Sequence, residues 1–124
     1  MNKRIEYKFD SNTRILFKYH FGTINFNDIE TSWIDAFNNN TIPENVIGFV
    51  LDYSEAELDM VAEEAKDITR FYREHLDVFR NRKVALVMTK PGHVVFPILV
   101  GMEADEYFTR AFYTTDAAVE WVLH

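Results

Sequence analysis

The sequence of 124 residues contains no cysteine, so disulfide bonds, thiolate nucleophiles and cysteine-based zinc sites are excluded. It has only four glycines and three prolines, and the glycines form no phosphate-binding loop. No apolar run approaches the roughly 18 residues of a membrane-spanning helix. The N-terminal stretch MNKRIEYKFD is charged from its start, so we expect no signal peptide and a cytoplasmic location.

Basic residues are also scarce. The chain has 13 Lys and Arg against 20 Asp and Glu, which gives a formal net charge of −7. Binding to nucleic acid or to an anionic membrane needs clustered Lys and Arg, so we expect neither partner. The four histidines are widely spaced and show no metal-ligand motif. We therefore expect no metal site and no cofactor.

Alternation of residue types predicts an N-terminal β-hairpin. Apolar and charged residues alternate over 5–10, and a second alternating run covers 15–21. In the second run, Lys18 and His20 alternate with the aromatic residues. The DSNT sequence between the two runs is rich in turn formers. Gly22 is expected to end the second strand.

The remaining chain alternates strand and helix patterns. Asn25 is placed to cap a helix with one apolar stripe, and Thr114 or Thr115 to cap a closing helix. The apolar runs VIGFVL and KVALVMT are typical of strands covered on both faces. The expected elements are strands at 4–10, 14–22, 46–51, 83–89 and 107–114, and helices at 23–40, 54–82, 91–105 and 115–124. This order predicts a single α/β domain over residues 1–124, with a mostly parallel sheet and one antiparallel edge.

The stretch VLDYSEAELDM, residues 50–60, holds the first candidate site. Asp52 and Ser54 are expected directly after a central strand, where ligands bind in open α/β sheets. With Asp59 and His93 they form a candidate strand-end site, in which Asp52 and His93 are a conceivable acid–base pair. Because no nucleophile or oxyanion motif accompanies them, we expect no enzyme. Ser54 also begins the capping box Ser54-x-x-Glu57, so its expected main role is to cap the long helix.

The segment GHVVFPILVGM, residues 92–102, is apolar almost all round. A short helix on a sheet needs only one buried stripe, so part of this surface is open for another role. It is a core helix, a face for a partner protein or a second copy of the chain, or the lid of an apolar ligand pocket. The candidate interaction residues are Val94, Val95, Phe96, Leu99, Val100 and Met102.

The element order, the Asp-x-Ser sequence after a central strand and the closing RAFYTTDAAVEWVLH together resemble the SpoIIAA-like branch of the STAS-like domains. These domains are related in fold to bacterial anti-sigma-factor antagonists. The resemblance implies a STAS-like mixed sheet, mostly parallel with an N-terminal antiparallel hairpin, flanked by about four helices. It also implies a bacterial, non-catalytic regulatory module that binds a protein or forms a homodimer.

The resemblance does not extend to the phosphorylation loop of the antagonists. Asp52 and Ser54 match its first part, and Asp59 stands near its second aspartate. Met60, however, occupies the place of the serine that is phosphorylated, and it has no hydroxyl group to modify. STAS-like domains are also similar in architecture to lipid-binding Sec14-type domains. The alternative function is therefore binding of a small apolar molecule or lipid.

Overall fold

The computed structural model describes residues 4–93, 96, 98 and 107–124. These residues form a five-stranded sheet with the strand order β1-β2-β3-β4-β5, in which β1 and β2 are antiparallel and the other neighbours are parallel. The strands are β1 (Ile5–Asp10), β2 (Ile15–Ile24), β3 (Gly48–Leu58), β4 (Lys83–Val87) and β5 (Phe108–Phe112). The helices are α1 (Phe26–Asn38), α2 (Ala65–Glu74), α3 (Leu76–Phe79) and α5 (Thr115–Leu123), with 3₁₀ turns η1 (Ala62–Glu64) and η2 (Pro91–His93). The predicted α/β fold with an antiparallel N-terminal hairpin is confirmed.

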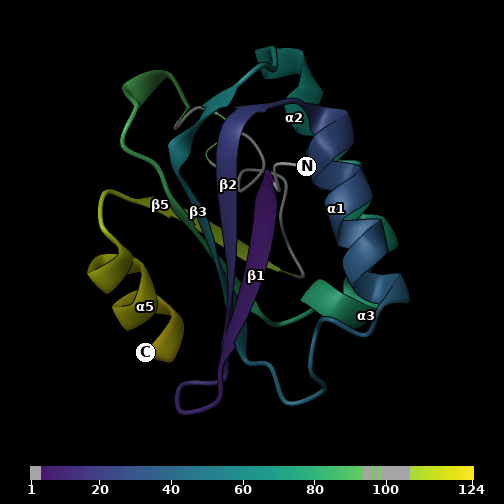
Figure 1. Ribbon diagram of the computed structural model, residues 1–124, viewed down its shortest axis with the longest axis vertical. Coiled ribbons are helices and arrows are strands. Elements are labelled where there is room, and N and C mark those ends of the chain that lie inside the picture. Colours follow the sequence, from purple (N-terminus) through teal and green to yellow (C-terminus); the bar gives the residue numbers. More distant parts are fainter. Residues whose placement is uncertain (1–3, 94–95, 97, 99–106) are drawn as a thin grey trace.

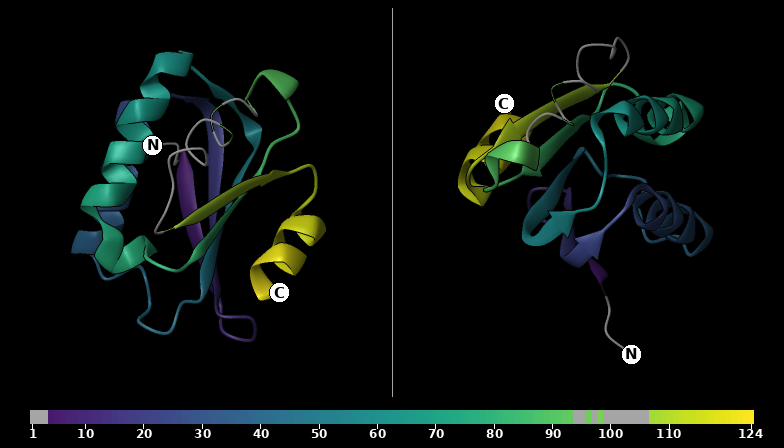
Figure 2. Two further views of the ribbon diagram at one scale, coloured as in Figure 1. Left: turned by 180° about the vertical axis from the view of Figure 1, so that it is seen from behind. Right: turned by 90° about the horizontal axis from the view of Figure 1, so that it is seen from above.

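Helices cover both faces of the sheet. Helices α1, α2 and α3 lie on one face, and α5 lies on the other (Figure 1, Figure 2). Strands β3 and β4 are therefore buried between two layers, and their residues 49–51 and 84–87 are all buried. This arrangement explains why both strands read as continuous apolar runs rather than as alternating ones.

The larger core cluster lies between the sheet and α1–α3 and is built around aromatic rings. Trp33 of α1 is fully buried, and its ring meets Phe49 and Phe79 edge to face at centroid distances of 5.6 Å and 5.2 Å. Such pairs are favourable because the positive edge of one ring meets the negative face of the other. A smaller cluster beneath α5 contains Ile15, Val50, Ala85, Val87, Ala118 and Val122.

Local polar contacts fix the ends of the hairpin and the helices as the sequence predicts. In the β1–β2 turn, the Asp10 carboxylate accepts hydrogen bonds from Asn12 N and Thr13 Oγ1. Asn25 and Asp28 form a reciprocal capping box at the start of α1, with N–O distances of 2.8 Å and 2.9 Å. Thr114, rather than Thr115, caps α5 by accepting from Ala117 N. These caps satisfy backbone N–H groups that the first helical turn leaves without partners.

The prediction that Ser54 caps a helix is wrong. Strand β3 continues through Leu58, so Ser54 lies inside a strand, and the first helical residues are those of η1 at 62–64. The reason is tertiary, because residues 21–24 of β2 pair with residues 55–58 of β3. This partner strand overrides the weak strand propensity of an acidic segment. The cap residue before η1 is Val61, whose N–H donates to the Glu64 carboxylate at 3.0 Å.

Two other predicted boundaries are also wrong. Gly22 does not end β2; it adopts a positive φ of 75° within the strand, which continues to Ile24. The long helix predicted from residue 54 to 82 is divided into η1, α2 and α3. The break between α2 and α3 falls at His75, whose ring packs against Phe37 and Phe71 at centroid distances of 4.9 Å and 4.5 Å.

Gly48 at the start of β3 is required by close packing. A Cβ atom at this position would lie 2.5 Å from Val122 Cγ1 and 2.9 Å from the Lys83 carbonyl oxygen. We expect Gly48→Ala to lower the free energy of unfolding by about 1–3 kcal/mol, because the backbone of β4 cannot move away cheaply. Gly92→Ala is the control, since no atom lies within 4 Å of its added Cβ. Urea denaturation measures both variants, and equal stability of the two would contradict the packing argument.

Candidate functional site

A β-bulge lies at the centre of the predicted strand-end site. Tyr19 is paired with Asp52, but the next pair is Phe21 with Glu55, so His20 alone faces two residues of β3. The pairing of β3 with β4 ends at the same point, with Asp52 opposite Val87. Asp52 therefore lies level with the carboxyl end of β4, although β3 itself continues. Bulges of this kind bend a strand and redirect its side chains.

Asp52 holds the bulge in place with both its side chain and its backbone. Its carboxylate accepts a hydrogen bond from Ser54 N at 2.8 Å, and its carbonyl oxygen lies 3.0 Å from His20 Nδ1. The phenol of Tyr19, the residue paired with Asp52, has a raised pKa because it is partly buried and close to this negative charge. In the described structure, Asp52 and Ser54 thus have structural roles at the bulge.

His20 is buried beside Asp52 and stacks on Tyr53 with a ring-centroid distance of 3.9 Å. Burial lowers the pKa of His20 well below its ordinary value, and the nearby Lys18 lowers it further. Because the Asp52 carbonyl can only accept, Nδ1 of the neutral ring carries the hydrogen. Nε2 then has a free lone pair, and it has no hydrogen-bond partner in the described part of the chain.

Lys18 is also fully buried, two residues before His20 on the same face of β2. Its Nζ lies 3.8 Å from the centroid of the Trp33 ring and has no hydrogen-bond partner among the described residues. An aromatic face favours a cation by up to about 2 kcal/mol, whereas removing an ammonium group from water costs several kcal/mol. Burial therefore dominates and lowers the pKa of Lys18 well below 10.5.

The sequence pattern does not reveal that Lys18 and His20 are buried. The alternation in β2 is correct, but large apolar side chains occur on both of its faces, so it does not reveal which face is covered. In the structure, Phe17 and Tyr19 on the α5 side remain half-buried, whereas Lys18 and His20 face the helices and are closed off. No feature of the pattern separates these two outcomes.

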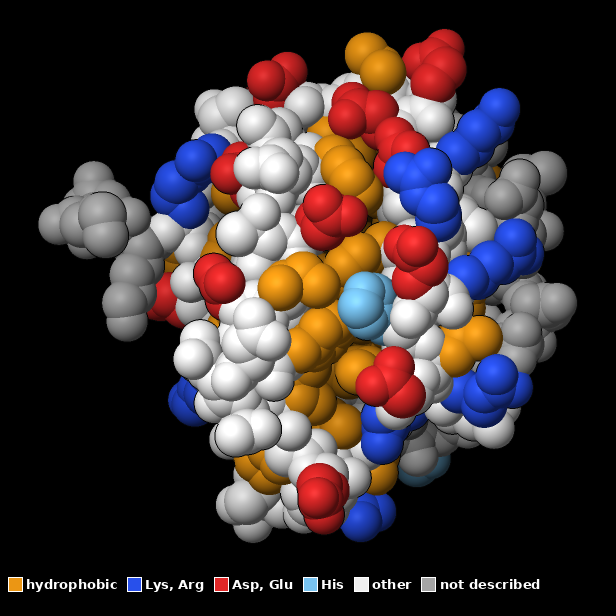
Figure 3. All heavy atoms as spheres, turned by 90° about the vertical axis from the view of Figure 1, so that its right-hand side faces the viewer, with side chains coloured by type: hydrophobic (Ala, Val, Ile, Leu, Met, Phe, Trp, Pro, Cys, Tyr) orange, Lys and Arg blue, Asp and Glu red, His pale blue; other side chains and the backbone are white. Residues whose placement is uncertain are grey.

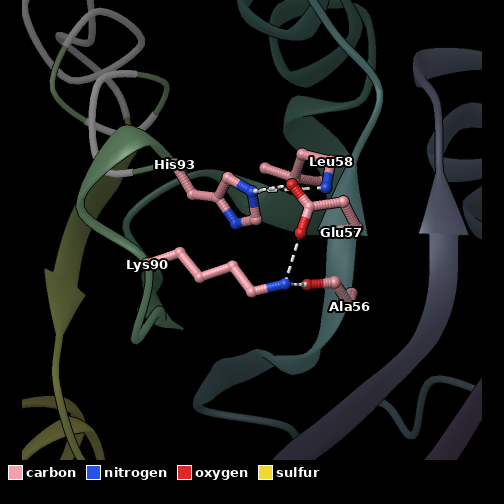
Figure 4. A network of polar contacts seen from close by, with 5 residues as sticks. All are labelled: Ala56, Glu57, Leu58, Lys90 and His93. Atoms are coloured by element: carbon pink, nitrogen blue, oxygen red, sulfur yellow. Dashed lines mark hydrogen bonds and ion pairs between the residues drawn. The ribbon is translucent and has the colours of Figure 1, made fainter.

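His93 contacts Glu57 and Leu58 near the end of β3. Its Nε2 lies 3.4 Å from both a Glu57 carboxylate oxygen and the Leu58 N–H (Figure 4). Unprotonated Nε2 accepts from that N–H, and protonated Nε2 donates to the carboxylate. The His93 side chain is buried, and its contacts with Glu57 and Leu58 connect η2 to the extended part of β3.

Lys90 completes this network from the segment just before η2. Its amine forms an ion pair with Glu57 and donates to the Ala56 carbonyl at 3.1 Å (Figure 4). The contacts with Lys90, and secondarily those with His93, lower the pKa of the Glu57 carboxyl. Glu57 and Lys90 remain about half exposed, so this polar cluster is open to solvent.

The four residues predicted for the strand-end site are thus distributed over separate contacts. Asp52 and Ser54 meet at the bulge, whereas Asp59 is exposed and donates its backbone N–H to the Ile24 carbonyl at 2.8 Å. His93 pairs with Glu57, and no hydrogen bond joins it to Asp52 within the described residues. The same residues contain no group of three His, Cys, Asp or Glu side chains that could hold a metal ion.

Within the predicted apolar segment 92–102, the structure describes Gly92, His93, Phe96 and Ile98, and Phe96 is the one described candidate interaction residue. Phe96 is buried and belongs to the larger core cluster, whereas Ile98 exposes 57% of its surface. Phe96 is therefore a core residue and not a surface contact. The other candidates, Val94, Val95, Leu99, Val100 and Met102, lie outside the described residues.

Phe96 lines a small apolar crevice together with Tyr53, Met60, Ile68 and Met88. Met60 is the residue that the sequence resemblance places at the position of the antagonists' phosphorylated serine. Its side chain is half-buried and packs against the core cluster. The crevice has a volume of about 30 Å³, which is room for about two water molecules.

The face that carries α1 and α2 presents a narrow strip of hydrophobic side chains between acidic and basic groups (Figure 3). Phe37 of α1 and Phe71 of α2 stack across the two helices at a centroid distance of 6.3 Å. None of the described helices combines the length and the apolar character that crossing a lipid bilayer requires.

Comparison with known proteins identifies the fold. No protein-family model and no curated protein matches the sequence. Among solved structures, the chain is similar to an uncharacterised protein of the DUF3478 family with a SpoIIAA-like fold from Shewanella loihica, with a TM-score of 0.64, 13% identity and 98% of each chain covered. It is also similar to the anti-sigma factor antagonist SpoIIAA in its unphosphorylated form, with a TM-score of 0.54, 12% identity, and 95% of this chain and 96% of that chain covered. The chain therefore has a SpoIIAA-like fold, as the sequence resemblance implied.

Burial of Lys18 makes stability depend on pH. Between the lowered folded-state pKa and the ordinary value of 10.5, the unfolded chain binds a proton that the folded chain does not, so stability rises with pH in this window. We expect Lys18→Met to be more stable than wild type at neutral pH, with a difference that shrinks toward pH 10.5. Denaturation at several pH values measures this. Lys66→Met is the control, because Lys66 is exposed, and a constant difference between Lys18→Met and wild type would contradict a lowered pKa of Lys18.

The Lys90 contact predicts a change in the titration of Glu57. Because Lys90 is the main cause of the lowered pKa of Glu57, we expect Lys90→Met to raise this pKa toward its ordinary value of 4.5. The carboxyl ¹³C shift of Glu57, followed by NMR as the pH is varied, reports the change. Lys66→Met should leave the curve unchanged. An unaltered Glu57 pKa in Lys90→Met would show that the ion pair does not persist in solution.

Proposed function

We propose that this chain is a non-catalytic regulatory module that acts by binding another protein in the cytoplasm. The observation that carries the proposal is the similarity in fold, over 95% of the chain, to an anti-sigma factor antagonist. Such an antagonist acts on a protein partner, and a similar scaffold is suited to the same kind of recognition. A similar fold alone does not establish a similar function. The surface chemistry of this chain is therefore needed to support protein binding.

Met60 bears on how such a module would be regulated. At the position that resembles the antagonists' phosphorylation site, this chain has a thioether side chain packed against the core cluster. A thioether cannot accept a phosphoryl group, so binding by this chain is not controlled by phosphorylation at residue 60. Ser54 is a hydroxyl-bearing residue nearby in sequence, but its backbone is held in β3 by Asp52.

Ile98 is the best-described position on the proposed interaction surface. Phe96 anchors this part of the chain in the core, and Ile98, two residues further on, is largely exposed. An exposed branched aliphatic side chain next to a buried aromatic anchor is suited to extending the apolar surface toward a partner. The alternative occupant of this surface is a second copy of the chain, in a homodimer through the 93–102 segment.

Binding of a small apolar molecule is the second candidate function. The crevice between Tyr53, Met60, Ile68, Met88 and Phe96 supports it, because its lining is apolar. Its volume of about 30 Å³ is far below the roughly 300 Å³ or more of typical ligand pockets. Ligand entry would therefore require the crevice to widen, and we favour protein binding.

Replacement of Ile98 tests the protein-binding proposal. We expect a protein that co-purifies with the tagged wild-type chain to bind Ile98→Asp at least about tenfold more weakly, since a buried carboxylate at an interface costs more than 1.4 kcal/mol. Tyr113→Asp is the matched control, because Tyr113 is 72% exposed and lies in the loop before α5. Circular dichroism checks that each variant is folded. Equal binding by Ile98→Asp and Tyr113→Asp, or no bound protein at all, would contradict the proposal.

A further inference from the structure

Strand β1 is an edge strand whose outer side has free backbone groups. In the described residues it pairs only with β2. The Phe21 N–H donates to the Arg4 carbonyl at 2.7 Å, which shows that Arg4 directs its backbone toward β2. Backbone direction alternates along an antiparallel strand, so Ile5, Tyr7 and Phe9 direct their N–H and C=O groups outward. Unpaired edges of this kind are templates for a further strand.

The sequence of β1 and the residue before it is self-complementary. Residues 4–10 read Arg-Ile-Glu-Tyr-Lys-Phe-Asp. Positions equally distant from Tyr7 carry opposite charges, namely Glu6 with Lys8 and Arg4 with Asp10. When two copies pair antiparallel about Tyr7, Glu6 lies opposite the partner's Lys8 and Ile5 lies opposite the partner's Phe9. The outward-directed residues then face each other, as a hydrogen-bonded antiparallel ladder requires.

Neighbouring registers are disfavoured by charge. A shift of the pairing by two residues in one direction places Glu6 opposite the partner's Glu6, and a shift in the other direction places Lys8 opposite the partner's Lys8. Like charges directly opposite each other are destabilising, whereas opposite charges are favourable. The register centred on Tyr7 is thus the one that pairs the full strand and also matches its charges. An edge lysine alone discourages pairing, but here Glu6 of the partner subunit compensates it.

Glu6 and Lys8 are available for this pairing. Both are exposed, and neither side chain has a hydrogen bond or ion pair within the described residues. Arg4 and Asp10 contribute less to the choice of register. Arg4 already forms an ion pair with Asp28 at 3.0 Å, and Asp10 accepts hydrogen bonds in the hairpin turn. The central charges therefore determine the register.

The opposite face of β1 provides apolar contacts. Ile5, Tyr7 and Phe9 pack against the larger core cluster but are only partly buried, because no strand lies beyond them among the described residues. A partner's β1 would place its own Phe9, Tyr7 and Ile5 beside them and cover their remaining exposed surface. Both faces of the edge thus fit a second copy of the same strand.

We propose that two copies of this chain associate through antiparallel pairing of their β1 strands about Tyr7, which forms one continuous sheet across a twofold axis. Each chain contributes the same patch, as twofold symmetry requires. This interface extends the proposed function by identifying one partner and its binding surface. It is distinct from the surface around Ile98, and the association can therefore be tested independently of any other protein.

Charge reversal tests the interface. We expect wild-type protein to dimerise in sedimentation equilibrium, and Lys8→Glu to dimerise about tenfold or more weakly, because it replaces both central attractions by repulsions. The double variant Glu6→Lys/Lys8→Glu should regain wild-type dimerisation, since it only exchanges the two charges. Exposed Lys66→Glu on α2 carries the same charge change as Lys8→Glu and should have no effect.

Cysteine cross-linking tests the register, because the chain has no cysteine of its own. Opposite residues of a non-hydrogen-bonded antiparallel pair have Cα atoms about 4.5 Å apart, within the range of a disulfide. A mixture of Glu6→Cys and Lys8→Cys should therefore form a mixed disulfide faster than either variant alone.

Several results would overturn the proposal. A wild-type monomer at all accessible concentrations would do so, as would a dimer that Lys8→Glu leaves intact. A folded double variant that fails to regain dimerisation, or equal cross-linking of the single and mixed cysteine variants, would exclude this register. Ile98→Asp should dimerise as wild type does, so loss of the proposed protein partner and loss of the dimer are separable results.

Discussion

The parallel pairing of β2 with β3 continues past the point where β4 and β5 end, and most of the polar groups described above depend on this extension. A bulge at His20 changes the register, so that Phe21 to Ile24 can pair with Glu55 to Leu58. Without this pairing, the acidic segment would lack backbone partners and would be free to become helical. The extension also positions Glu57 where Lys90 and His93 reach it from the segment after β4.

The interior of this domain contains buried polar side chains. Lys18 and His20 enter the face that α1 covers, and the Trp33 ring lies directly over the lysine amine. Hydrogen bonding to Asp52 satisfies one nitrogen of His20, whereas Nζ of Lys18 has no hydrogen-bond partner among the described residues. Buried polar groups reduce stability unless they are paired. Their presence next to an aromatic cluster means that packing of Trp33, Phe49 and Phe79 must compensate.

The two ends of the sheet have different chemistry. Strand β5 presents an exposed Phe108 and is followed by the exposed Tyr113, whereas β1 at the opposite edge alternates charged and apolar residues. A mixed edge such as β1 can form a specific pair through its charges, because a wrong register brings like charges together. The charges of β1 support its proposed role in binding a second copy of the chain, whereas the Ile98 surface is proposed to bind a partner protein.

Much of the architecture could be predicted because local signals and burial agree. Alternation in 5–10 and 15–21 predicts the hairpin, Asn25 and Asp28 predict a helix start, and the continuous apolar runs predict β3 and β4. The prediction failed where two local signals compete. Ser54 and Glu57 have the spacing of a capping box, yet the same stretch alternates exposed Glu55 and Glu57 around the buried Ala56, as a strand does.

The sequence by itself determined the order of elements, the SpoIIAA-like fold class and the absence of a serine at residue 60, because these follow from periodicity, capping and residue identity along the chain. Only the tertiary structure decided that Ser54 lies in a strand, that Lys18 is buried, and that His93 meets Glu57 and not Asp52. These outcomes depend on which residues of β2 lie opposite β3. A register between strands is set by contacts distant in sequence, and a shift of one residue at His20 changes every pair beyond it.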